Sequence, residues 1–196
     1  MPEEILVHVE SRAELRAWLA AHAAESPSIM LVTWKRATGR PAPSYDDIVE
    51  EALCFGWIDS AGRTIDDERT ALRLSPRRRG SGWARTNKVR VERLERDGQM
   101  TDAGRAVLER AKADGSWTLL DAVEALEVPD DLAAALAARP PARERFDAFP
   151  PSARRALLEW IVQAKRPETR RRRIEETAVR AENNERANQW IPKEKR

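Results

Sequence analysis

The sequence is poor in the residues from which disulfides and metal sites are built. It contains a single cysteine, Cys54, and only two histidines, which excludes an intrachain disulfide and leaves no pair at metal-ligand spacing. Cys54 lies beside Phe55 on an apolar helical pattern, and we interpret it as a core thiol rather than a nucleophile. We therefore expect neither a metal nor a cofactor.

The motifs of several enzyme classes are missing as well. There is no GxxxxGK[ST] phosphate loop, no GxSxG elbow and no GxGxxG after a strand, so we lean against an enzyme while leaving the question open. No apolar run approaches the roughly 20 residues that span a bilayer, and the N-terminus lacks a signal-peptide pattern. We expect a cytoplasmic protein without membrane insertion, and the oligomeric state stays open.

Charge is abundant, but neither sign dominates. The 35 basic and 33 acidic residues leave a net charge of +2, so an electrostatic function requires local segregation of charge. Residues 44–68 hold eight acidic residues against Arg63 alone, whereas residues 71–96 hold nine basic residues against Glu92 and Glu95. The sequence thus places an acidic block directly before a basic block.

The hydrophobic pattern predicts an α+β fold, with a small antiparallel sheet and packed helices followed by an all-helical C-terminal region. Residues 5–9 and 28–37 are typical of strands, and Ser11 and Ser44 have the spacing of helix caps. Residues 57–77 predict two or three short strands joined by tight turns around Ala61, Gly62 and Asp67. The sheet is therefore expected within the first 80 residues or so.

Beyond Gly82 the pattern is helical to the end of the chain. We expect a helix over residues 83–96, with Ser81 able to cap it, and a last helix that begins at Pro167. Residues 127–151 are interpreted as the linker region, with a short helix over residues 131–138 inside it. We accordingly assign residues 1–126 to an α+β body and residues 127–196 to a helical C-terminal region.

The stretch LSPRRRGSGWARTNK, residues 74–88, is the strongest candidate site. Gly80 and Gly82 permit turns, and the N–H groups of a following helix together with the arginines would form an anion cradle. The candidate ligand-binding residues, including two from the preceding GWIDS segment, are Trp57, Asp59, Ser75, Arg77, Arg79, Ser81, Trp83 and Asn87.

Each of these residues also has a structural interpretation. Trp57 and Trp83 fit a core as well as a ligand platform. Asn87 has two interpretations. It either faces a cleft, or it stabilises the loop of Arg77, Arg78 and Arg79 or the GWIDS turn through hydrogen bonds. Arg77 and its neighbours either bind an anion or form a solvated turn paired with the acidic block, so these alternatives stay open.

Four blocks of the chain, in order, resemble the YdeI/OmpD-associated family, also labelled bacteriocin-protection proteins. The blocks are EEALCFGWIDS, DDERTALRLSPRRRGSGWARTNKVRVERL, GQM followed by AKADGSW, and SARRALLEWIVQAKRPETRRRRIEE. The positions that match the family pattern are Gly56, Trp57, Asp59, Ser75, Pro76, Arg77, Ser81, Trp83 and Asn87. The chain departs from that pattern at Leu74, where Phe is common, and at Ala84, where Ser is usual. Because the hydroxyl is missing at position 84, the sequence gives less support to the idea that this position performs essential chemistry.

The resemblance implies a bacterial cytosolic protein linked to envelope or antimicrobial stress, without implying a reaction. Our leading hypothesis is a non-enzymatic accessory protein that binds an anionic small molecule or an acidic protein surface at the Arg77, Trp83 and Asn87 cleft. Nucleic acid stays open as a partner, although one Tyr and three Phe leave few rings for base stacking. The alternatives are an enzyme of unknown class that uses Asp59 with Arg77 and Asn87, and a structural protein-interaction module.

Overall fold

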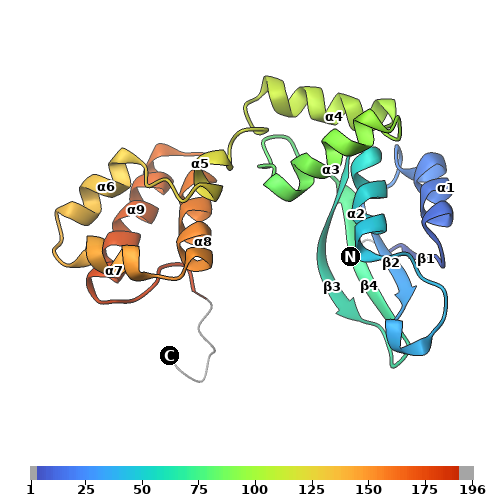
Figure 1. The fold of residues 1–196 in the computed structure, drawn as a ribbon, viewed down its shortest axis with the longest axis horizontal. Helices are drawn as coiled ribbons and strands as arrows, with labels where there is room; N and C mark the ends of the chain where they lie inside the picture. The colour runs from blue at the N-terminus through green and yellow to red at the C-terminus, as the bar shows by residue number, and fades with distance from the viewer. Residues whose placement is uncertain (1–3, 190–196) are drawn as a thin grey trace. The chain divides into compact units, whose positions relative to one another are not determined.

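The computed structural model describes residues 4–189, which divide into two compact units (Figure 1). The first unit is formed by residues up to 81 and by residues 86–117. The second is formed by residues 82–85 and by the chain from residue 118 onward. Strands occur in the first unit and the second is helical, so the predicted α+β fold is confirmed.

A four-stranded sheet forms the centre of the first unit, with the strand order β1-β2-β4-β3. The strands are β1 (Leu6–His8), β2 (Ile29–Trp34), β3 (Trp57–Thr64) and β4 (Arg69–Pro76). β2, β4 and β3 are antiparallel, as predicted, while β1 joins the edge of β2 in parallel. The 3-10 helix η1 (Arg36–Thr38) follows β2.

The β3–β4 hairpin differs in detail from the sequence prediction. A tight turn was expected near Gly62, but the pairing passes through that point with a β-bulge between Asp59 and Gly62. A bulge absorbs one extra residue and bends the strand without ending it. β3 is therefore one continuous strand, and the hairpin turns only after Thr64.

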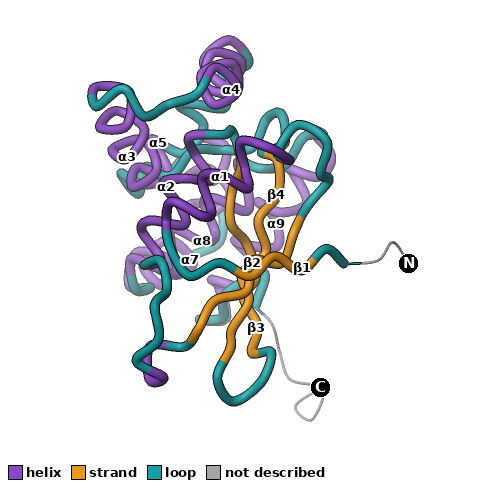
Figure 2. Tube along the Cα trace, turned by 90° about the vertical axis from the view of Figure 1, so that its right-hand side faces the viewer, coloured by secondary structure: helices purple, strands orange, loops and turns teal. Residues whose placement is uncertain are grey.

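Helices α1 (Arg12–His22) and α2 (Tyr45–Cys54) lie on the same side of the strands (Figure 2). Ser11 caps α1 as predicted, and Ser44 forms a capping box with Asp47 at the start of α2. The apolar faces of both helices pack on Ile29, Leu31, Trp57 and Leu74 of the sheet, in one hydrophobic cluster. The helical spacing of Tyr45 with Ile48 and Ala52 predicts a place in the same apolar stripe, but Tyr45 is exposed.

Helix α4 (Asp102–Ala113) is held against the C-terminal end of α2. The hydroxyl of Thr101 donates to the carbonyl of Cys54 at 2.6 Å, and a Cβ on Gly104 would lie 2.2 Å from the same carbonyl oxygen. Glycine is needed at position 104 because only it allows this close approach of two helices. Cys54 is buried, and burial raises the pKa of its thiol, which fits the predicted core thiol.

The second unit consists of helices around one apolar core. They are α5 (Asp121–Glu124), α6 (Asp130–Ala137), α7 (Ala142–Ala148), α8 (Pro151–Val162) and α9 (Pro167–Glu182). α9 begins at Pro167 as predicted, since proline suits the first helical position. The interpretation of residues 127–151 as a linker is wrong, because they contain α6 and α7 and supply the buried Leu132, Leu136 and Phe146.

No helix within residues 4–189 is both long enough and apolar enough to cross a membrane.

Candidate functional site

The predicted site residues that precede the arginines lie at the paired ends of β3 and β4. Trp57 is opposite Pro76, and Asp59 is opposite Leu74. Ser75, opposite Ile58, is partly buried. Trp57 is almost completely buried and packs edge-on against Trp18 at 6.4 Å between ring centroids, so it contributes to the core.

Asp59 is held by a residue of α2. The Tyr45 hydroxyl donates to Asp59 Oδ2 at 2.7 Å, and this hydrogen bond to a carboxylate raises the pKa of Tyr45. The exposed ring of Tyr45 thus lies over the end of the hairpin. The contact gives Asp59 a structural role, which connects α2 to β3.

Arg77 is a buried cation, with 6% of its surface exposed. Its backbone N–H donates to the carbonyl of Gly56 at 2.9 Å, which fixes the chain where it leaves β4. Burial lowers the pKa of the guanidinium to about 10, while the charge of Asp59 opposes that shift. At neutral pH Arg77 therefore remains protonated, and it is electrostatically coupled to Asp59.

The loop that follows Arg77 is exposed. Ser81 donates its N–H to the carbonyl of Arg78 at 3.3 Å, and Gly80 has a φ of +70° with open space where a side chain would begin. Asp114, at the end of α4, takes part in this loop. A hydrogen bond from Ser116 is the main cause of the lowered pKa of Asp114, and the Gly80 N–H and the charge of Arg79 add to it.

The expected helix start at Trp83 is wrong, because α3 spans Arg85–Arg96 and Ser81 does not cap it. Gly82 and Trp83 instead belong to the second unit, where Trp83 is buried. A Cβ on Gly82 would lie 2.7 Å from Leu120, so this segment packs too closely for other residues. The N–H of Arg85 donates to both carboxylate oxygens of Glu124, at 2.9 and 3.1 Å. Glu124 thus supplies the anion expected at this helix start.

Asn87 lies two residues further into α3 and bonds within that helix. Its side-chain oxygen accepts from Arg90 Nη1 at 3.1 Å, and Arg90 Nη2 reaches Asp46 of α2 at 2.6 Å. This hydrogen bond is structural, as one alternative held, but its partner is neither the arginine loop nor the GWIDS turn.

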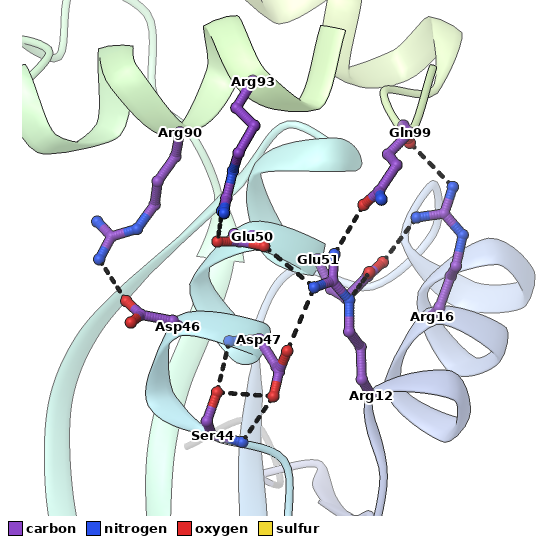
Figure 3. A network of polar contacts seen from close by, with 10 residues as sticks. All are labelled: Arg12, Arg16, Ser44, Asp46, Asp47, Glu50, Glu51, Arg90, Arg93 and Gln99. Carbon is purple, nitrogen blue, oxygen red and sulfur yellow. Dashed lines mark hydrogen bonds and ion pairs between the residues drawn. The ribbon is translucent and has the colours of Figure 1, made fainter. Parts of the chain in front are cut away.

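A charged network between α1, α2 and α3 is the main polar feature that the sequence prediction missed (Figure 3). Two carboxylates of α2, Glu50 and Glu51, are buried at its centre. Arg12 binds Glu51 at 2.7 Å and Glu50 at 3.0 Å, and Arg16 binds Glu51 at 2.8 Å. Arg93 of α3 also pairs with Glu50.

The network shifts the pKa values of Arg12, Arg16 and Asp47 in the direction of their charged forms. Burial acts to lower the pKa of Arg12 and Arg16, but the hydrogen bonds and charge of Glu51 outweigh it, so both are raised. The Ser44 hydroxyl and then Arg12 lower the pKa of Asp47. Gln99 completes the arrangement by accepting from Arg12 at 2.8 Å and, through its backbone, from Arg16 at 2.9 Å.

The network pairs residues of the acidic block with residues of the basic block. Arg90 and Arg93 belong to the basic block, and they pair with Asp46 and Glu50 of the acidic block. The i, i+3 spacing of the two arginines and the i, i+4 spacing of the two carboxylates place each pair on one helix face, but these spacings do not show that the two faces meet. Much of the segregated charge is therefore neutralised inside the first unit.

The arginines left over lie near the end of β4. Arg73 and Arg78 are exposed, and neither makes an ion pair to another residue of the described part of the chain. Arg79 is exposed beside Asp114. The site predicted from sequence thus separates into a scaffold, formed by the buried Trp57 and Arg77 and the half-buried Asp59, and an exposed loop.

Comparison with known proteins gives two family matches, in different parts of the chain. Residues 7–107 match a family described as a domain of unknown function, DUF8412. Residues 125–184 match the family described as bacteriocin-protection, YdeI or OmpD-associated. The searches of curated proteins and of solved structures found no match.

The matches refine the resemblance that the sequence blocks indicated. The last block, residues 152–176, falls within the bacteriocin-protection match, whereas the blocks at residues 50–60 and 66–94 fall within the other one. The chain belongs to the DUF8412 family through residues 7–107, and residues 125–184 are similar to the bacteriocin-protection, YdeI or OmpD-associated family.

Proposed function

We propose that the protein is a non-enzymatic accessory protein that binds an anionic ligand or an acidic protein surface through the loop after β4. The binding residues would be Arg78, Arg79 and Ser81, which we call the arginine loop, with Gly80 at its turn. The family description of residues 125–184 supports a role in protection against bacteriocins. We place this role in the cytoplasm.

One observation carries the proposal: the arginine loop presents exposed guanidinium groups that the rest of the first unit leaves largely uncommitted. Arg90 and Arg93 are engaged by α2, whereas Arg78 makes no ion pair within the described residues. An anion at this loop would meet charge-assisted hydrogen bonds, which are about twice as strong as neutral ones.

The scaffold beneath the loop supports its geometry. The backbone of Arg77 is tied to Gly56, and Gly80 is turned towards Asp114. Asp114 should weaken binding at this loop, because an anionic ligand must compete with this carboxylate for Arg79. Binding should therefore be weak at high salt, where exposed charges are screened within about 3 Å at 1 M ionic strength.

The enzymatic alternative finds less support in this geometry. It needs Asp59, Arg77 and Asn87 to serve one reacting group, but Asp59 accepts from Tyr45 and Asn87 accepts from Arg90. Both polar groups are thereby given structural partners.

The test compares the double variant Arg78→Ala/Arg79→Ala with the wild type in calorimetric titrations with inorganic pyrophosphate at low ionic strength. We expect at least about tenfold weaker binding, since each hydrogen bond to a charged group contributes about 1.5–3 kcal/mol. The control is Arg36→Ala/Arg96→Ala, which removes the same charge from exposed positions elsewhere in the first unit.

Equal affinity of the wild type and the loop variant would overturn the proposal. So would an equal loss in the control, because the effect would then reflect net charge alone. An Arg77→Ala variant is avoided, since Arg77 is buried and its loss would disturb the fold.

A further inference from the structure

The second unit contains a cavity of about 420 Å³ that the proposed function does not use. It is lined by α5, α8, the turn before α6 and the start of α9. Its size lies within the roughly 300–1,000 Å³ of small-molecule sites.

The inner wall of the cavity is apolar. Val123, Leu158 and Ile161 line it, and all three are buried members of the hydrophobic core of this unit. Val128 and Val162, which pack against the same core, extend the wall. Because the wall is part of a packed core, the cavity is preformed, and an apolar group that enters it loses contact with water.

At the rim of the cavity, unpaired negative charges outnumber unpaired positive charges among the described residues. Arg170 lines it, but Asp131 binds this guanidinium through two contacts, Nε to Oδ2 at 2.7 Å and Nη2 to Oδ1 at 2.8 Å. Glu127 and Asp130 also line the cavity, are exposed, and make no ion pair with any residue in the described part of the chain. The rim therefore has one neutralised cation and two available carboxylates.

We propose that this cavity binds lipophilic ammonium compounds, with the apolar body against Val123, Leu158 and Ile161 and the ammonium group at Glu127 and Asp130. The apolar wall supplies affinity, since each buried CH₂ contributes about 0.8 kcal/mol, and the carboxylates select the sign of the ligand's charge. This ligand is opposite in charge to the one proposed for the arginine loop, and it is bound by a different unit.

The test is a fluorescence titration of the full chain with dansylcadaverine, which joins an apolar ring system to a primary ammonium group. The uncharged probe N-pentyldansylamide, which has the same ring system and chain without the ammonium group, is titrated in parallel. We expect saturable binding of the amine and binding of the uncharged probe that is about two- to fivefold weaker, which corresponds to about 0.5–1 kcal/mol for an exposed ion pair.

Two variants separate the wall from the rim. Glu127→Gln/Asp130→Asn should weaken the amine about two- to fivefold and leave the uncharged probe unchanged. Glu144→Gln/Glu168→Gln, which removes the same charge from exposed positions of α7 and α9, should change neither. Ala122→Phe, which adds a ring at an exposed residue of the lining, should weaken both probes.

Three outcomes would overturn this proposal: no saturable binding of the amine to the wild type, equal affinity for both probes, or full binding by Glu127→Gln/Asp130→Asn. An unfolded Glu127→Gln/Asp130→Asn protein would lose the binding of both probes, whereas loss of the rim charge alone weakens only the amine. The two probes therefore distinguish unfolding from the expected effect.

Discussion

The two units of the chain use charge in different places. In the first unit, Glu50 and Glu51 are buried, and Glu51 is only 1% exposed where it receives Arg12 and Arg16. In the second unit the interior is an apolar cluster around Phe146, and a representative ion pair, Arg143 to Asp147, is about half exposed on both sides.

This difference determines which substitutions each unit tolerates. A carboxylate buried with its partners costs little while the set is complete, but removal of one partner leaves uncompensated charge or unpaired hydrogen-bonding groups. An apolar core responds mainly to lost volume, and its surface ion pairs contribute about 0–1 kcal/mol each. The first unit should therefore be sensitive to changes of charge and the second to changes of size.

The largest effect is expected from Phe146→Ala, because this side chain is fully buried in the core of the second unit. The free energy of unfolding of that unit should fall by about 3–5 kcal/mol. Hydrogen exchange, read by peptide, should show lost protection in α6 to α9, with the sheet of the first unit unchanged. Val179→Ala, at an exposed position of α9, is the control, and an equal loss of protection in both units would contradict the comparison.

An intermediate effect is expected from Glu51→Ala in the first unit. Arg12 and Arg16 both lose their buried partner, but they are partly exposed, so the cost should be about 2 kcal/mol rather than the 3–5 of a fully buried pair. Chemical denaturation followed by hydrogen exchange of α1 and α2 measures it. Glu109→Ala, which removes an exposed partner of Lys112, should cost less than about 0.5 kcal/mol, and equality of the two variants would count against a central role for Glu51.

The smallest effect is expected in acid, where one carboxylate of each unit can be compared. A hydrogen bond from Ser44 lowers the pKa of Asp47, and one from Arg170 lowers that of Asp131. A lowered pKa in the folded state stabilises fully above the unfolded value, near 4, and this contribution disappears as the pH falls through the folded pKa.

Asp47→Asn and Asp131→Asn should therefore each cost less than about 1 kcal/mol near pH 7, since both side chains are partly exposed. The difference from the wild type should shrink as the pH falls from about 5 to 2. Denaturation curves over this range measure it, and a difference that grew in acid would reverse the assigned sign.

The sequence was most informative where the relevant forces act locally. The capping of α2 by Ser44, the start of α9 at Pro167 and the burial of Cys54 all follow from neighbours within one or two turns of helix. These features were predicted correctly.

Prediction failed where a distant partner decided the outcome. Serine is a common helix cap, so Ser81 was expected to cap α3. Gly82 instead packs on Leu120, and the helix begins only at Arg85. The proline pairs on either side of α7 are typical of a linker. Phe146 of α7 is nevertheless buried in the hydrophobic core of the second unit. The pairing of Arg93 with Glu50 joins residues 43 positions apart, which no local pattern contains.

The predicted site shared this limit. Local chemistry placed Asp59, Ser75 and Arg77 together at the hairpin end, but it could not foresee that Tyr45 would bind Asp59 or that Arg90 would bind Asn87. Trp83 proved to belong to the second unit. The boundary between residues 126 and 127, proposed as the limit between the α+β body and the helical C-terminal region, stays a prediction.

The assignment of residues 82–85 to the second unit means that neither unit is one continuous stretch of the chain. A gene fragment that begins at residue 118 would encode the five helices of that unit without the buried Trp83. Transfer of this module to another protein would therefore need a graft of two separate pieces. Within one gene, the same interleaving makes a deletion of either half damaging to the other.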